Sequence, residues 1–270
     1  MIKKLAIIGV GLIGGSLALA LKKAGLVEQV TGYSRSAAAR DEALALGIID
    51  NAADSLKEAV ADADMVFVAV PMGAMQTVFE QMAPHLKSQA IVTDAGSAKH
   101  QVVEAARRAL GDKFDRFVPG HPIAGTEKSG PSAAFAELYQ QHRVVLTPVA
   151  ETDKNALEQV RQMWQQAGAD VFDMEVEHHD VVLAATSHLP HVLAFNLVGM
   201  LSKRDDCDEV LRYAAGGFRD FSRIASSDAV MWRDICLGNR HAILELLEQY
   251  RRGLDQIEQA IRQDDGDYLI

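Results

Sequence analysis

Cysteine and aromatic side chains are scarce in this chain of 270 residues. There are two cysteines, Cys207 and Cys236, and neither belongs to a CxxC pair or to a cluster of cysteines and histidines. This spacing argues against a disulfide framework and against a zinc site. We therefore expect two reduced thiols and no bound metal, as is usual for a cytoplasmic protein.

An excess of basic residues is also missing. The chain has 27 Lys and Arg against 37 Asp and Glu, which gives a formal net charge of −10. Hydrophobic residues make up 49% and charged residues 24%, so a disordered chain is excluded and a globular one is expected. The acidic balance disfavours nucleic acid as a partner, but it permits a local basic pocket for one small anion.

Two uncharged stretches raise the question of a targeting or membrane segment. Residues 5–21 resemble the apolar region of a signal peptide, but four glycines interrupt them, which argues against that interpretation. Residues 181–201 are long enough to span a bilayer, but they contain polar side chains. These are Ser187, His188, His191 and Asn196. We expect a buried helix that carries a polar site, in a cytoplasmic protein with no membrane partner.

The first half of the chain alternates short apolar runs with helical patterns. Strands are predicted at residues 4–8, 29–33, 65–70, 90–94, 117–118 and 143–148, and a helix at 16–24. Strands separated by helices predict an α/β fold with a doubly wound, mostly parallel sheet. After about residue 174 only helical periodicity remains, including an amphipathic helix at 239–262. We therefore expect a dinucleotide-binding domain at 1–173 and an all-helical domain at 174–270.

A glycine-rich fingerprint follows the first predicted strand. Gly9, Gly11 and Gly14 match GxGxxG and open a predicted helix, a context that distinguishes a dinucleotide site from a glycine turn without ligand. The helix N-terminus offers N–H groups to the pyrophosphate. The predicted cofactor-binding set also contains Leu12, Ile13, Val70 and Pro71.

The end of the second strand discriminates between NAD and NADP. An acidic residue there would bind the ribose 2′-hydroxyl, but this chain has Ser34 and Arg35 instead. An arginine beside hydroxyl groups suits a 2′-phosphate, so NADP is the preferred cofactor in this interpretation, with NAD also possible. The alternative interpretation is that Arg35 is a solvated loop residue that does not bind the cofactor.

Two segments at the ends of later strands carry candidate chemistry. DAGSAK contains Ser97, and GHPIAGTEKSG contains His121. Ligands of open α/β sheets bind outside the carboxyl ends of strands, so both segments should face the cofactor. A neutral histidine can take the proton of a carbinol as hydride leaves it, and Ser97 could orient the same hydroxyl. The alternative for His121 is an ordinary surface histidine.

The helical half contains two further segments of this kind. SHLPH places His188 and His191 on one face, and Pro190 should kink the helix or mark an irregular turn. A metal would need further ligands, for which only His178 and His179 are near, so contact of His188 with substrate is favoured. The alternative is a core histidine whose hydrogen bonds are satisfied within the protein.

The last segment is FRDFSRIASSD. Arg219 and Arg223 lie one turn apart, with Asp220 able to brace Arg223. An arginine held in place by a carboxylate is suited to bind a substrate carboxylate. The alternative interpretation is a helix with an ordinary ion pair on the protein surface.

Taken together, these motifs resemble the prephenate and arogenate dehydrogenases of tyrosine biosynthesis. The resemblance runs from GVGLIGGSLA through DAGSAK, GHPIAGTEKSG and SHLPH to FRDFSRIASSD and MWRDI, in order. It implies NAD(P)-dependent oxidative decarboxylation by a homodimer, with a Rossmann domain and a helical dimerisation domain. The residue roles that it implies are His121 as catalytic base assisted by Ser97, Arg223 on a substrate carboxylate, His188 near the substrate, and Glu127 and Trp232 shaping the pocket.

Two rival interpretations remain open at this point. Another two-domain dehydrogenase of a small hydroxy or imino acid would often use a lysine from the helical half, and residues 181–201 contain none. A non-catalytic NADPH sensor would not need His121, His188 and Arg223 together. The Ser34–Arg35 tip departs from family members that carry an acid there.

Overall fold

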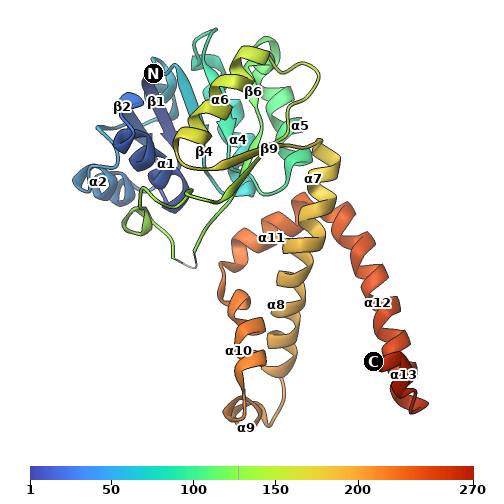
Figure 1. Ribbon diagram of the computed structural model, residues 1–270. Coiled ribbons are helices and arrows are strands. Elements are labelled where there is room, and N and C mark those ends of the chain that lie inside the picture. Colours follow the sequence, from blue (N-terminus) through green and yellow to red (C-terminus); the bar gives the residue numbers. More distant parts are fainter. Residues whose placement is uncertain (127) are drawn as a thin grey trace. The chain divides into compact units, whose positions relative to one another are not determined.

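The computed structural model describes residues 1–126 and 128–270, so the predicted pocket residue Glu127 lies outside the described residues. The chain divides into two compact units, Met1–His179 and Asp180–Ile270 (Figure 1). Each unit is described by itself.

The first unit is built on a six-stranded parallel sheet with the order β3-β2-β1-β4-β5-β6. Its strands are β1 (Ile2–Ile8), β2 (Val27–Tyr33), β3 (Asn51–Ala52), β4 (Met65–Val68), β5 (Ile91–Asp94) and β6 (Phe117–Val118). Helices connect them: α1 (Leu12–Lys23), α2 (Ala37–Ala45), α3 (Leu56–Val60), α4 (Met75–Met82) and α5 (Lys99–Leu110). Every residue of β4 and β5 is buried, because helices cover both faces of the sheet. The predicted doubly wound α/β architecture is confirmed.

The strand order reverses between β1 and β4, which makes this a topological switch point. The chain moves outward through β2 and β3 on one side and through β5 and β6 on the other. Crossover connections leave the carboxyl ends of β1 and β4 in opposite directions, so a crevice opens there. The fold thus places a ligand site next to the glycine-rich loop.

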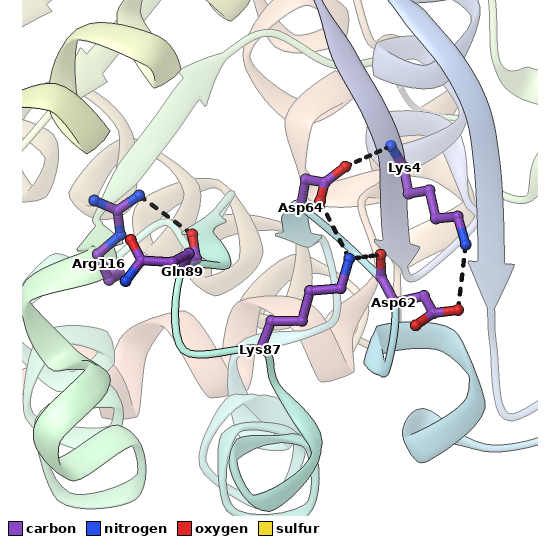
Figure 2. Close-up of polar contacts among 6 residues, drawn as sticks. All are labelled: Lys4, Asp62, Asp64, Lys87, Gln89 and Arg116. Carbon is purple, nitrogen blue, oxygen red and sulfur yellow. Dashed lines mark hydrogen bonds and ion pairs between the residues drawn. The ribbon is translucent and has the colours of Figure 1, made fainter.

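The amino ends of the strands are held by polar contacts (Figure 2). Asp64, which precedes β4, accepts the backbone N–H of Lys4 in β1 at 3.0 Å and also pairs with Lys87 at 3.2 Å. The Lys4 ammonium pairs with Asp62 at 3.2 Å, with both side chains largely exposed. Exposed pairs of this kind each stabilise a fold by less than about 1 kcal/mol, so the Lys4–Asp62 contact contributes little to stability.

A second, smaller sheet follows β6 in the same unit. It contains β7 (Gly120–Ile123), β8 (Arg143–Leu146) and β9 (Asp170–Asp173), with α6 (Lys154–Gln166) between the last two. β7 runs antiparallel to β8, and β8 runs parallel to β9. The strand predicted at 143–148 therefore belongs to a separate mixed sheet. This sheet positions His121, which lies opposite Val145.

The second unit is entirely helical, as predicted. α7 (Val176–Leu183) enters it and continues through a π-helical segment (Ala184–His188) into α8 (Leu189–Leu201). The remaining helices are α9 (Cys207–Arg212), α10 (Gly216–Arg223), α11 (Ala229–Gly238), α12 (Arg240–Arg262) and α13 (Gly266–Leu269). The π-helical segment ends two residues before Pro190, so the predicted irregular turn is confirmed.

Much of the apolar surface of the second unit is uncovered in a single chain. Val176–Leu201 is one helix, 26 residues long, that is apolar enough to cross a membrane by length and composition, yet only 22% of its most apolar window is buried. The expectation of a buried helix is wrong for the isolated chain, because few neighbouring side chains cover it. The apolar stripe of α12 is likewise open, with Leu254, Ile257 and Ile261 between 44% and 60% exposed.

Candidate active site

The glycine-rich loop connects β1 to α1 at the switch point. Gly9 has a φ of +103°, which favours glycine, and a Cβ there would overlap the Ala69 carbonyl beyond β4. A Cβ on Gly14 would lie 2.8 Å from the Ile7 side chain, so a side chain here would push the helix off the strand. The helix begins at Leu12, earlier than the predicted residue 16, because the glycines that resemble a loop pack closely enough to continue as helix.

The start of α1 presents its N–H groups without a side-chain cap. Gly11 is the N-cap residue, and a Cβ there would meet no atom within 4 Å. Leu12 and Ile13 form the first turn, which contains no acidic residue. Val70 and Pro71 follow β4, with Val70 packing next to Gly9. This open, uncapped helix end fits the pyrophosphate of a dinucleotide.

The tip of β2 is fixed by a residue that the sequence patterns did not single out. Arg40 in α2 donates to the Ser34 carbonyl at 2.7 Å and pairs with Asp54 at 2.9 Å. Ser36 caps α2 by accepting the Ala39 N–H. Arg35 is exposed at this tip. The tip therefore presents an exposed guanidinium on a rigid turn.

A fully buried ion pair lies at the carboxyl end of β5. The Lys99 ammonium donates to Asp94 at 2.5 Å and to the Gly120 carbonyl at 2.6 Å, and both charged side chains are 0% exposed. Asp94 also accepts the N–H of Gly96 at 2.7 Å and of Gly120 at 3.1 Å. Ser97 lies half-buried between Gly96 and the start of α5. The pair thus ties the Ser97 loop to the residue that precedes His121.

His121 is paired with a second histidine. Its Nδ1 lies 2.9 Å from Nε2 of His179 in α7, and the rings meet edge to face at 63°. His121 is 8% exposed and His179 is 0% exposed, so His121 is not the ordinary surface histidine of the alternative interpretation. The motif containing Lys99 was noticed in the sequence, but His179 gave no signal beyond its adjacency to His178. Within the described residues, no cluster of three or more His, Cys, Asp or Glu side chains could hold a metal ion.

His188, in the helical unit, is held by an asparagine. Its Nδ1 lies 3.1 Å from the amide nitrogen of Asn239, which also donates to the Asp180 carbonyl at 2.7 Å. Because the amide nitrogen can only donate, Nδ1 of His188 accepts and its proton lies on Nε2. His188 is 1% exposed. Asn239 is a second residue that the sequence did not reveal, since its partner lies 51 positions away.

His191 and Trp232 form a stacked pair in the same unit. Their ring centroids are 3.7 Å apart with an interplanar angle of 17°. Burial lowers the pKa of His191, the hydrogen bond to the Ser187 carbonyl raises it, and the charge of Arg223 lowers it. The indole nitrogen of Trp232 is buried and has no hydrogen-bond partner among the described residues. A buried donor without a partner is costly, so this N–H is suited to an acceptor on a ligand.

Arg223 differs from the prediction in one respect. It is exposed at the end of α10, and among the described residues no ion pair joins it to Asp220. The predicted bracing is therefore wrong, because both side chains extend into solvent from an exposed helix. The guanidinium is left available for an external carboxylate.

These features define a class of protein first: a dinucleotide-binding oxidoreductase with a Rossmann unit followed by a helical unit. Residues 17–173 match the family model for the nucleotide-binding domain of prephenate dehydrogenase, and residues 175–270 match the model for its dimerization domain. The chain belongs to the prephenate dehydrogenase family.

Individual relatives agree over nearly the whole chain. A cyclohexadienyl dehydrogenase of Zymomonas mobilis is 44% identical over 99% of this chain and 92% of its own length. A prephenate dehydrogenase of Bacillus subtilis is 39% identical over 97% of this chain and 71% of its own length. The crystal structure of prephenate dehydrogenase from A. aeolicus in complex with hydroxyphenyl propionate and NAD+ has a TM-score of 0.92 at 36% identity, covering 100% of this chain and 94% of that chain. The Synechocystis arogenate dehydrogenase has a TM-score of 0.82 at 30% identity, covering 98% and 94%.

Proposed function

We propose that this protein catalyses the oxidative decarboxylation of prephenate to 4-hydroxyphenylpyruvate, of arogenate to tyrosine, or of both. The observation that carries the proposal is the buried His121 on β7, in the same unit as a glycine-rich loop that opens onto the uncapped helix α1. The A. aeolicus relative binds NAD+ and an aromatic hydroxyphenyl acid, which is consistent with this product class.

The proposal is tested by following formation of the reduced cofactor at 340 nm with purified protein. Four combinations are assayed, each pairing prephenate or L-arogenate with NAD or NADP. Turnover in at least one combination is expected. Tight NADPH binding without turnover of either substrate would instead favour a sensor or a different substrate.

His121 performs the proton chemistry in this mechanism. Bound NAD(P) supplies the acceptor for the hydride that leaves the ring carbinol carbon. His121 takes the hydroxyl proton, and Ser97 donates to or orients the same oxygen. The carbonyl that develops on the ring accepts the electron pair released as carbon dioxide leaves the opposite ring carbon, and the resulting phenolate oxygen takes the proton back from His121. The ring becomes aromatic, so the protein has to position the substrate and handle a single proton.

Arg223 binds a substrate carboxylate in this proposal, and the other proposed substrate-binding residues are His188, Trp232 and Glu127. We predict that Arg223→Gln raises KM by about 10-fold or more, because it removes a charge-assisted contact worth about 1.5–3 kcal/mol in the ground state. The kcat should change little. Steady-state kinetics with the preferred substrate measure this, and Arg219→Gln is the matched control on the same helix. A normal KM for Arg223→Gln with a raised KM for Arg219→Gln would transfer the role to Arg219.

NADP is the preferred cofactor in this proposal, with NAD also accepted. The exposed Arg35, at a tip that Arg40 holds rigid, supports contact with a 2′-phosphate. We predict that Arg35→Ala lowers kcat/KM for NADP by about 10-fold or more while leaving the value for NAD unchanged, since only NADP carries the second phosphate. The exposed Arg108 provides a control variant, Arg108→Ala. Wild-type kcat/KM that favours NAD tenfold would contradict the proposal.

We also propose a cytoplasmic homodimer, with domains at 1–173 and 174–270. The uncovered apolar faces of α8 and α12 support association of two helical domains, because such stripes are costly to leave in water. The match to a dimerization domain supports the same assembly. Light scattering during size-exclusion chromatography should give the mass of two chains in the absence of detergent.

A further inference from the structure

The pairing of His121 with His179 restricts where protons lie in the site. The facing nitrogens are 2.9 Å apart, a distance that requires one hydrogen between them. The backbone N–H of His179 donates to the Glu175 carbonyl at 2.9 Å, which fixes its backbone at the start of α7, and complete burial confines its ring.

Two neutral arrangements of this pair are possible, and they have opposite consequences. In one, Nδ1 of His121 carries the hydrogen and donates it to His179, which leaves a lone pair on Nε2 of His121. In the other, His179 donates, and the hydrogen of His121 lies on its Nε2. Only the first arrangement leaves Nε2 able to take a proton from a substrate hydroxyl.

The first arrangement, in which His121 donates to His179, also stabilises His121 after it has taken up a proton. Once His121 has gained a proton, both of its ring nitrogens carry hydrogen, and an acceptor on His179 stabilises the cation. The opposite arrangement would then place two N–H groups against each other. The backbone on the amino side of His121 is already fixed, since Gly120 bonds to Asp94 through its N–H and to Lys99 through its carbonyl. The ring orientation is what remains for His179 to set.

We propose that His179 is a positioning residue for the reaction, accepting a hydrogen bond at Nε2 from Nδ1–H of His121 and thereby keeping Nε2 of His121 unprotonated, so that it can act as the base. This inference rests on the proposed function for its kinetic consequence. Its structural content, the tautomer of His121, does not depend on the substrate.

The first test is a nitrogen NMR spectrum of the wild-type protein labelled with ¹⁵N-histidine. The nine histidines give two ring nitrogens each, and the His121 pair is assigned by its loss in His121→Asn. We expect hydrogen on Nδ1 and none on Nε2 above the titration of the ring. Hydrogen on Nε2 in the wild-type protein would overturn the proposal whether or not the enzyme turns over either substrate.

The second test compares variants of α7. His179→Leu should lower kcat by about 10- to 100-fold with KM within about twofold, because the base loses its orienting partner rather than a substrate contact. His179→Gln, whose amide oxygen can accept the same hydrogen bond, should restore most of the rate and keep the hydrogen on Nδ1. The exposed neighbour supplies the control His178→Leu, which should behave as wild type. Should His179→Leu fail to fold, the glutamine variant and the wild-type spectrum still decide the tautomer.

The possible failures are separable. Wild-type turnover together with an unchanged kcat in His179→Leu would reject the positioning role and leave the proposed function standing. Absence of wild-type turnover on prephenate and arogenate would reject the proposed function, while the spectrum would still report whether His179 sets the tautomer.

Discussion

His121→Asn should lower kcat by at least about 100-fold, because it removes the group that takes the substrate proton. Asparagine retains polar atoms of similar size but cannot accept a proton near pH 7. His121 lies on β7 and is not one of the predicted cofactor-binding residues, so the Kd for NADPH should stay within about twofold of the wild-type value. Steady-state kinetics and NADPH fluorescence titration measure the two quantities.

Ser97→Ala serves as a comparison for this experiment. It removes a hydroxyl that orients the substrate but does not carry the proton, so its effect on kcat should be smaller than that of His121→Asn. Wild-type kcat in His121→Asn with a large loss in Ser97→Ala would remove His121 from the role of base.

The large sheet and the dinucleotide loop could be predicted because their signals are local in sequence. β4 is a short apolar run, and β5 begins with Ile91 and Val92 and is buried along its whole length. The GxGxxG spacing follows directly from how closely β1, α1 and β4 pack. β3 and β9 escaped prediction for the opposite reason. β3 has two residues, and β9 begins and ends with an aspartate, so neither has an apolar pattern of its own. Both exist because a neighbouring strand offers free backbone groups.

The partners of the candidate catalytic residues were harder to predict than the residues themselves. His121 stands in the conspicuous motif GHPIAG, whose first four residues form β7, but His179 lies 58 positions away on a different element. Asn239 and His188 are likewise distant in the sequence. Hydrogen bonds across such separations depend on tertiary packing, which periodicity does not encode. The same reason explains the error at α10, where spacing suggested an Asp220–Arg223 pair that solvent exposure leaves unmade among the described residues.

Lys99→Met should lower the free energy of unfolding by about 3–5 kcal/mol, the second large effect expected from this structure. The substitution leaves Asp94 fully buried with two backbone N–H donors, from Gly96 and Gly120, and without its counter-charge. Methionine fills a similar volume, so the loss comes from the uncompensated carboxylate rather than from a cavity. Urea unfolding followed by circular dichroism measures the difference.

Lys4→Met supplies the control, since the Lys4–Asp62 pair in Figure 2 is largely exposed and should contribute less than about 1 kcal/mol. The double variant Lys99→Met with Asp94→Asn tests the cause. It removes the buried charge while the amide oxygen can still accept a backbone N–H, so it should recover part of the lost stability relative to Lys99→Met alone. Equal losses in Lys4→Met and Lys99→Met would mean that the buried pair contributes no more than a surface one. In that case the connection between the Ser97 loop and the strand of His121 would depend on the backbone hydrogen bonds to Asp94 instead.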